Sequence, residues 1–395
     1  MRIDHVRIEK HPQQTVLLAD CLYQDTAHEI FYAVESQFGQ YLDDDSADAF
    51  VLAALIRAMA EGEDLEVNYP ISSKLYYHLN TYLIPYLANV DQQLTLIKIK
   101  PLKGYNDKQY HARAVATGIS CGIDSFYTVL RNLEEDVPQS SRLTHLVLNR
   151  HQPETEFSHA QLSISDKDQE RLEVGQELGL IPVYVWTNVD QFINFPYEQI
   201  CTFHDLSVGL SLKKLISTYY YASSFTLKDF HPTFAAAPYY DPLNSLAIQT
   251  ESFQMLTHAV HEERIDKTAF LAKYPIVQQH LDVCFYEHHD GHKKNCTWCE
   301  KCVRTTMALH ALGELDKFNT VFDLDLFQKD YNQRVGEVAY RAYVNKVSFD
   351  RDIMHLMRQN HKEIPLTGYA WMIRIGVQHQ MDKIKAMIHY KSVQA

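Results

Sequence analysis

A short run of small residues joins a strand-like segment to a helix-like segment, and this junction constrains the fold more than any other feature of the chain. The segment 112–119 is rich in apolar residues, 126–130 reads as the first turns of a helix, and between them stands Ser120-Cys121-Gly122-Ile123-Asp124-Ser125. In such a turn the backbone N–H groups and the positive end of the helix dipole point at one place, and serine hydroxyls add donors. The junction is typical of an anion site. The alternative is an ordinary turn in which a serine or aspartate caps the helix.

Segments of strand and helix character alternate from about residue 108 onward, which is typical of an α/β fold with a parallel sheet. We expect strands at 143–148 and 182–187, a helix near 167–179 between them and a helix at about 206–221. In such sheets ligands bind beyond the carboxyl ends of the strands. Asn149 follows a predicted strand, as the small-residue junction does, so we expect it to contribute to the same ligand site.

Residues 1–105 are expected to form a separate N-terminal α+β domain, because they carry strand and helix patterns but no catalytic cluster. The predicted strands are Gln14–Tyr23, Glu29–Ser36, Leu65–Val67 and Leu94–Ile99. The predicted helices are Asp45–Glu61 and a segment that begins at Ser72 or Ser73 and ends or kinks at Pro85. A parallel, doubly wound domain at 106–312 and a mainly helical region at 313–395 would complete the chain.

Four of the seven cysteines lie within 19 residues of one another, at Cys284, Cys296, Cys299 and Cys302. Three cysteines at two-residue spacing, joined by a fourth from a preceding segment, can close a tetrahedral thiolate shell around Zn²⁺. Four thiolates also suit an iron–sulfur cluster, so that alternative stays open. Three histidines between the first two cysteines could replace a ligand, although solvent exposure is more usual for them: His288, His289 and His292.

The junction Ser120–Ser125 resembles the S-G-G-x-D-S pyrophosphate loop of the PP-loop ATP pyrophosphatases, with Cys121 in place of the first glycine. Together with the cysteine cluster and the signature Cys296–Thr305, it resembles the 7-cyano-7-deazaguanine synthase family over about residues 108–312. The resemblance implies an adenine nucleotide alpha hydrolase-like sheet and an ATP-dependent ligase that requires Mg²⁺. Such an enzyme adenylates a small-molecule or peptide carboxylate, releases pyrophosphate, and passes the acyl group to ammonia or an amine, giving an amide or a nitrile.

The residues expected to bind ATP are those of the junction. Gly122 lets the backbone approach the phosphates, and the two serines donate to them. Asp124 either caps the helix or helps to place Mg²⁺. The full set is Ser120, Cys121, Gly122, Asp124, Ser125 and, from the next strand, Asn149.

Other residues are candidates for catalysis and for the acceptor substrate. Arg264 and Lys267 share one helix face, and Lys267 could neutralise the departing pyrophosphate; the alternative is a plain surface pair. Asp241 could hydrogen-bond an amine or a heterocycle, or could simply form a turn before Pro242. Arg304 could reach an anionic substrate or pair with a glutamate one turn earlier on the helix.

Cys121 keeps two other functions open. A thiol at a helix N-terminus has a lowered pKa and could carry sulfur to a nucleobase, which would make the protein a sulfur transferase. The replacement of glycine also allows a non-catalytic ATP-binding partner protein. A side chain at position 121 is expected to be tolerated only if φ stays negative.

Charge and hydropathy exclude some classes of function. The formal charge of −13 lacks the basic footprint of a nucleic-acid-binding protein, so binding to nucleic acid is not expected. No apolar stretch reaches the roughly 18 residues that span a bilayer. Cysteine usage without a secretory signal suggests the cytoplasm. A homodimer is compatible with the sequence.

Overall fold

The computed structural model describes residues 1–395 except 161, 232, 287–292, 363 and 394–395, and it describes no side chains at 383 and 386–393. The histidines at 288, 289 and 292 therefore lie outside the described residues. Two compact units are present. The first comprises Met1–Ile119 and Thr128–His261, and the second comprises Ser120–Tyr127 and Glu262–Ala395.

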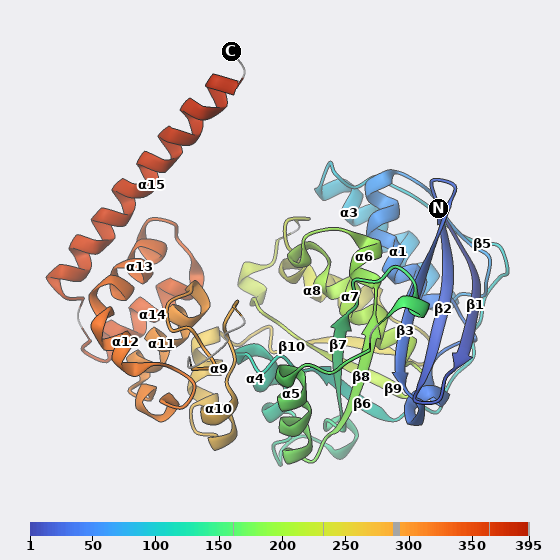
Figure 1. Ribbon diagram of the computed structural model, residues 1–395, viewed down its shortest axis with the longest axis horizontal. Coiled ribbons are helices and arrows are strands. Elements are labelled where there is room, and N and C mark those ends of the chain that lie inside the picture. The colour runs from blue at the N-terminus through green and yellow to red at the C-terminus, as the bar shows by residue number, and fades with distance from the viewer. Residues whose placement is uncertain (161, 232, 287–292, 363, 394–395) are drawn as a thin grey trace. The chain divides into compact units, whose positions relative to one another are not determined.

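One mostly parallel sheet of ten described strands organises the first unit (Figure 1). Its strands are β1 (Arg2–Lys10), β2 (Gln14–Tyr23), β3 (Thr26–Glu35), β4 (Leu65–Val67), β5 (Ile99–Pro101), β6 (Ala114–Gly118), β7 (His145–His151), β8 (Ile181–Thr187), β9 (Ile216–Ala222) and β10 (Gln254–His258). Their order is β10-β9-β6-β7-β8-β3-β2-β1-β4-β5. The neighbours from β10 to β8 are parallel, whereas β8–β3, β3–β2 and β2–β1 are antiparallel. The α/β class with a largely parallel sheet is thus confirmed.

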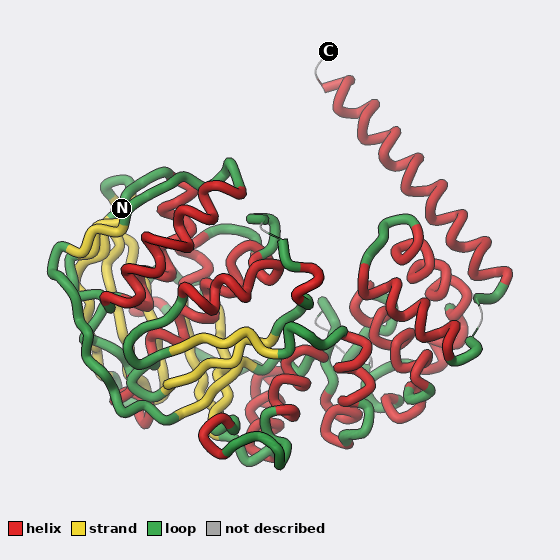
Figure 2. The backbone as a smooth tube through the Cα atoms, turned by 180° about the vertical axis from the view of Figure 1, so that it is seen from behind, coloured by secondary structure: helices red, strands yellow, loops and turns green. Residues whose placement is uncertain are grey.

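The helices of the first unit connect these strands, and Figure 2 shows them in red beside the yellow strands. They are α1 (Asp48–Glu61), α2 (Ser73–His78), α3 (Ile84–Val90), the end of α4 (Ile123–Arg131), α5 (Asp166–Glu177), α6 (Val189–Ile193), α7 (Tyr197–Ser211) and α8 (Asp241–Ala247). A π-helical turn, Leu79–Leu83, joins α2 to α3. Short 3₁₀ turns lie at Ser36–Tyr41, Gln139–Ser141, Phe157–His159, Leu227–Asp229 and Ala237–Tyr240.

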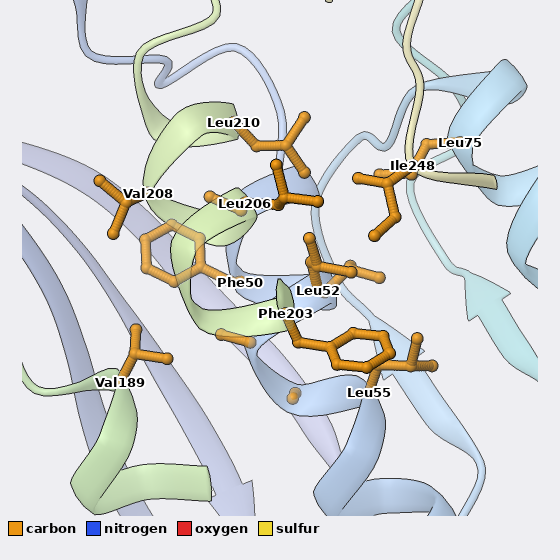
Figure 3. Close-up of a cluster of buried hydrophobic side chains, with 14 of the residues drawn as sticks. Phe50, Leu52, Leu55, Leu75, Val189, Phe203, Leu206, Val208, Leu210 and Ile248 are labelled. Atoms are coloured by element: carbon orange, nitrogen blue, oxygen red, sulfur yellow. The ribbon is translucent and has the colours of Figure 1, made fainter. Parts of the chain in front are cut away.

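The helices lie on both faces of the sheet. Successive side chains of a strand point to opposite sides, so the contacts of neighbouring residues in β8 identify which helix covers which face. Val183 and Val185 of β8 belong to the buried core that also holds α1 and α7. Tyr184, between them, donates from its hydroxyl to Asp168 of α5 at 2.8 Å. Figure 3 shows the first of these layers, in which α1 and α7 pack through the following side chains: Phe50, Leu52, Leu55, Phe203 and Leu206.

Strands from the first hundred residues belong to the same sheet as the later ones. Tyr32 and Val34 of β3 pair with Thr187 and Val185 of β8, and β2 and β1 follow β3 outward. The grouping into two units therefore differs from the predicted division at about residues 105 and 312. The residues of one strand do not indicate which distant strand it pairs with, so the sequence did not predict the pairing of β3 with β8.

The predicted elements agree with the structure in several places and are wrong in others. Ser72 caps α2 by accepting from the Leu75 N–H at 3.0 Å, as predicted. The predicted helix at 206–221 is wrong in its second half, since α7 ends at Ser211 and β9 follows. Three consecutive tyrosines at 219–221 favour the strand there. The predicted strand Leu94–Ile99 is also displaced, because the strand begins only at Ile99.

The second unit is helical in its described part. It contains the start of α4, then α9 (Arg264–Leu271), α10 (Pro275–His280), α11 (Glu300–Leu312), a 3₁₀ turn (Leu315–Phe318), α12 (Leu324–Lys329), α13 (Tyr331–Tyr343), α14 (Ser348–Gln359) and α15 (Leu366–Val393). Helices α13 and α15 approach closely at Gly336, where a Cβ would lie 2.8 Å from the Gly368 carbonyl oxygen. Glycine is required there for packing.

Candidate functional site

The small-residue junction forms a tight turn between β6 and α4. The hydroxyls of Ser120 and Ser125 lie 3.0 Å apart, and the Ser125 hydroxyl donates to the Gly122 carbonyl at 3.2 Å. The Gly122 N–H donates to the Ser120 hydroxyl at 3.3 Å. Two hydroxyls and a backbone N–H are thus gathered where α4 begins. These are the donor types that anion-binding turns present.

Cys121 adopts a left-handed backbone conformation, with φ at 59°. This corrects the expectation that φ would stay negative once a side chain stood at this position. The conformation costs an L-residue about 1–2 kcal/mol. Cys121 is only 3% exposed, and its carbonyl oxygen accepts from the Asp282 N–H at 2.9 Å, so burial and a backbone hydrogen bond offset the strain.

Asp124 is the meeting point of two cations from α9. Its Oδ2 accepts from the Arg264 guanidinium at 2.6 Å, and its Oδ1 accepts from the Lys267 ammonium at 3.1 Å. Lys267 is 2% exposed. Burial alone would raise the pKa of Asp124, but the Arg264 and Lys267 charges outweigh it and hold that pKa below its usual value. The interpretation of Arg264 and Lys267 as a plain surface pair is therefore wrong.

Arg304 takes part in an ion-pair network within the second unit. Its Nε donates to Asp350 Oδ2 at 2.8 Å, and its Nη1 lies 2.6 Å from Glu300 Oε1. Asp350 is fully buried and also accepts from Arg341 at 2.8 Å. The predicted pairing with a glutamate one turn earlier is thus confirmed. Arg304 holds α11 to α14, and this role accounts for its position without a substrate.

The four cysteines converge as their spacing predicts. Their sulfur atoms lie within 4.8 Å of one another, with Cys284 and Cys299 4.0 Å apart and Cys296 and Cys302 3.7 Å apart. Sulfurs at 2.3 Å from one zinc ion would be separated by about 3.8 Å, so the donor set fits a single tetrahedral ion. The N–H groups of Trp298 and Cys299 donate to the Cys296 sulfur at 3.4 and 3.1 Å, which stabilises a thiolate there. The group could hold a metal ion such as zinc.

The thiols of the cysteine group differ strongly in pKa: that of Cys299 is lowered to about 4, chiefly by its hydrogen bond with Cys302. The pKa of the Cys302 thiol lies far above its usual range, because of its hydrogen bond with Cys299 and because of burial. Burial likewise raises the pKa of Cys296 to about 11. Neighbouring sulfurs cannot all ionise together without a positive charge among them, and a bound metal ion supplies that charge.

A chain of short contacts connects the cysteine group to the small-residue turn. The Asp282 N–H donates to the Cys121 carbonyl, and the next residue, Val283, donates from its N–H to Asn295 Oδ1 at 2.8 Å. Asn295 is buried and directly precedes Cys296, while Cys284 follows Val283. The segment that carries the four cysteines therefore supports the turn at its left-handed residue.

Asn149 and Asp241 belong to the first unit. Asn149 lies in β7, and its amide donates to Asp205 at 2.9 Å. Asp241 begins α8 and is fully buried, where it accepts from the Thr202 hydroxyl at 2.7 Å and the Asn244 amide at 3.2 Å. Burial raises the pKa of Asp241 to about 7, so near neutral pH it is partly protonated. Asp241 thus stands buried at the start of α8, directly before Pro242.

Lys301 is a residue of the site that the sequence did not single out. Its ammonium lies 4.2 Å from the centre of the Phe285 ring. Desolvation and then the Arg264 charge lower its pKa, while Asp124 and Asp282 oppose them. Lys301 thus adds a third cation near Asp124. Its place between the last two cysteines of the cluster was the signal that could have indicated it.

No family model, curated protein or solved structure matches this chain. In the part of the chain that the structure describes, no helix combines the length and apolar character needed to cross a membrane.

Proposed function

We propose that this protein is an ATP-dependent ligase that adenylates a carboxylate, releases pyrophosphate, and passes the acyl group to ammonia or an amine. The observation that carries the proposal is the convergence of Arg264 and Lys267 on Asp124, the fifth residue of the Ser120–Ser125 turn. The resemblance of this turn to PP-loop enzymes, and of the whole site to the 7-cyano-7-deazaguanine synthase family, supports the same reaction.

The strand order of the sheet favours nucleotide binding at this turn. β6 lies between β7 and β9, so successive connections run to one side of β6 through β7 and β8 and to the other side through β9 and β10. In open parallel sheets, ligands bind beyond the carboxyl end of the strand where the order reverses in this way. The residues that directly follow β6 are those of the turn.

The charges around Asp124 suit the departure of pyrophosphate. When a carboxylate oxygen attacks the α-phosphorus of ATP, the bond to the bridging oxygen breaks and negative charge accumulates on pyrophosphate. Arg264, Lys267 and Lys301 are three cations near one carboxylate, so an excess of positive charge is available to stabilise that charge. Both oxygens of Asp124 already bind cations, so Mg²⁺ would be held mainly by the phosphates of ATP.

The metal in the cysteine group would be structural zinc. Four thiolates leave no open position for water or substrate. An iron–sulfur cluster fits less well, since its irons and sulfides would hold the four thiolates farther apart than they are here. The cysteine group would act on the turn through the protein itself, by the hydrogen bond from the Asp282 N–H to the Cys121 carbonyl.

We do not propose sulfur transfer through Cys121, because a thiol that is 3% exposed is poorly placed to attack or to carry sulfur. A non-catalytic ATP-binding protein would need the turn but not a buried lysine paired with Asp124. The substrate to be adenylated would be a small-molecule or peptide carboxylate.

Product analysis tests the proposal. The purified chain is incubated with Mg²⁺ and ATP labelled at the α-phosphate, together with pools of carboxylates and ammonia. AMP and pyrophosphate are the expected products, and Lys267→Gln should reduce their formation at least tenfold. Lys273→Gln is the matched control, because this lysine lies just beyond α9 and contacts Phe270 and Tyr274 instead. Release of ADP and phosphate, or equal activity of the two variants, would refute the assignment.

A further inference from the structure

Two histidines and an aspartate of the first unit meet near the carboxyl ends of neighbouring parallel strands. His151 is the last residue of β7 and pairs in register with Thr187, the last residue of β8. Asp190 lies in α6, directly after β8, and His204 lies in α7. One ligand atom from each of the three lies within 4.8 Å of the others. This edge of a parallel sheet is where such folds bind ligands.

The buried side of this cluster holds polar atoms that other groups do not satisfy. His204 is 1% exposed, and its Nε2 lies 3.6 Å from Asp190 Oδ1, which is beyond hydrogen-bond distance. Neither of these two buried atoms has a hydrogen-bond partner among the described residues. Burying such atoms unpaired is unfavourable, so an occupant between them would stabilise the arrangement.

The third member approaches from the exposed side. His151 Nδ1 forms a short contact with the other oxygen of Asp190, and the His151 and His204 rings lie 4.6 Å apart at an angle of 37°. The His151 side chain is 46% exposed. The edge of the Tyr197 ring lies near His151, with the ring centres 6.2 Å apart. The cluster is therefore closed on the His204 side and open to solvent on the His151 side.

A second carboxylate orients the buried histidine. His204 Nδ1 lies 3.1 Å from Asp205 Oδ1, and the Asn149 amide donates to the same oxygen at 2.9 Å. A proton on Nδ1 directed at Asp205 leaves the Nε2 lone pair pointing toward Asp190. Metal-binding histidines are oriented in this way, by a carboxylate on the nitrogen that does not bind the ion. Asn149 thus positions Asp205 in this cluster.

We propose that His151 Nδ1, an Asp190 oxygen and His204 Nε2 bind one divalent transition-metal ion of the zinc class, separately from the four cysteines. Neutral imidazoles and one carboxylate are the ligands that zinc takes in sites with an open position. The fourth position would face solvent beside His151 and could take water or the carboxylate or phosphate of a small molecule. This site does not depend on the proposed ligase activity.

The fit requires only a small movement. Ligands at about 2.0–2.1 Å from zinc stand about 3.3 Å apart in a tetrahedron, close to the 3.6 Å between His204 Nε2 and Asp190 Oδ1. The His151–Asp190 contact is shorter than this, so the exposed His151 ring must move outward by about 1 Å. The alternative occupant is a proton, shared as an ion pair between His204 and Asp190.

Metal stoichiometry tests the proposal. The full chain is equilibrated with a zinc buffer that holds the free ion well below micromolar, then desalted and measured by elemental analysis. We expect two zinc ions per chain in the unmodified protein and one in His204→Gln. The isosteric Asp190→Asn, which should fold even if His204→Gln does not, is also expected to bind one. His159→Gln, at a solvent-exposed histidine of the same unit, is the matched control and should bind two.

Cobalt substitution separates the two sites by spectroscopy. Thiolate-bound cobalt gives intense charge-transfer absorption, whereas a site of two histidines and one aspartate gives only weak visible bands. Loading the second cobalt equivalent should therefore leave the charge-transfer band unchanged in the unmodified protein, and Asp190→Asn should lose that equivalent alone. One metal per chain in every protein, or the same stoichiometry in His204→Gln, Asp190→Asn and the unmodified chain, would overturn the proposal in favour of the shared proton.

Discussion

Replacing Cys121 by glycine tests the backbone conformation of the turn and its chemical role in one variant. The left-handed φ of 59° costs cysteine about 1–2 kcal/mol, which glycine does not incur. Against this gain, glycine adds about 0.5–1 kcal/mol of unfolded-state freedom, and removing the buried CH₂SH group costs about 1 kcal/mol. These effects nearly cancel. The free energy of unfolding of Cys121→Gly should therefore lie within about 1 kcal/mol of the unmodified value.

Cys121→Ala is the matched control, because it removes the sulfur but keeps a Cβ in the left-handed conformation. At ordinary positions alanine is more stable than glycine by about 0.4–1 kcal/mol, but at positive φ the order is reversed. We expect Cys121→Gly to be more stable than Cys121→Ala by about 1 kcal/mol. Urea unfolding followed by tryptophan fluorescence measures this, since Trp298 and Trp371 both report on the unit that contains the turn.

Two results would refute the reasoning. If Cys121→Ala were as stable as Cys121→Gly, the backbone at this position would not be left-handed in solution. If Cys121→Gly bound ATP normally but formed no AMP, the thiol would take part in the reaction, and the ligase proposal would give way to sulfur chemistry. Normal turnover in both variants is the expected outcome.

Three further predictions concern other residues. Asp124→Ala leaves the buried Lys267 charge without this carboxylate, so it should lower the free energy of unfolding by about 2–4 kcal/mol in urea titrations. Asp136→Ala removes an exposed ion pair and should change the free energy of unfolding little. Cys299→Ser should weaken the charge-transfer band of the cobalt-loaded protein, because one of four thiolates is lost, and should lower the folding yield. Stoichiometric iron in the purified chain would contradict zinc. Because the Asp241 pKa is raised to about 7 in the folded state, the unfolded chain ionises first, and stability should fall as pH rises from about 4 to 7. Asp241→Asn should lack this dependence of stability on pH. Thermal melts of both proteins across that pH range measure it, and an equal slope in the two would contradict the prediction.

Local patterns were sufficient to predict several elements. Gln14–Tyr23 and Leu65–Val67 are strands with the predicted bounds, because β-branched and apolar residues are concentrated there. Cysteine spacing likewise predicted the convergence of four sulfurs, since two-residue spacing brings thiols together on a tight turn. These features depend on residues that are close in sequence.

Features that depend on distant residues were not predictable in the same way. The predicted helix at 206–221 continued the leucine pattern of α7 into β9, where pairing with β6 and β10 determines the structure. The His151, Asp190 and His204 cluster combines the end of one strand with two helices, at spacings that form no motif. Only the strand register, which sets His151 beside Thr187, brings the first two ligands near one another.

The left-handed cysteine is explained by what holds it rather than by its own preference. A residue in this conformation persists when its surroundings compensate for the strain. Here the Cys121 carbonyl accepts from the Asp282 N–H, two residues before Cys284, so the segment that leads into the cysteine group fixes the carbonyl direction. The Cys121 side chain is itself 3% exposed. The hydrogen bond from this segment therefore allows cysteine at a position with positive φ, where glycine is usual, because the turn geometry no longer depends on the residue's own conformational freedom.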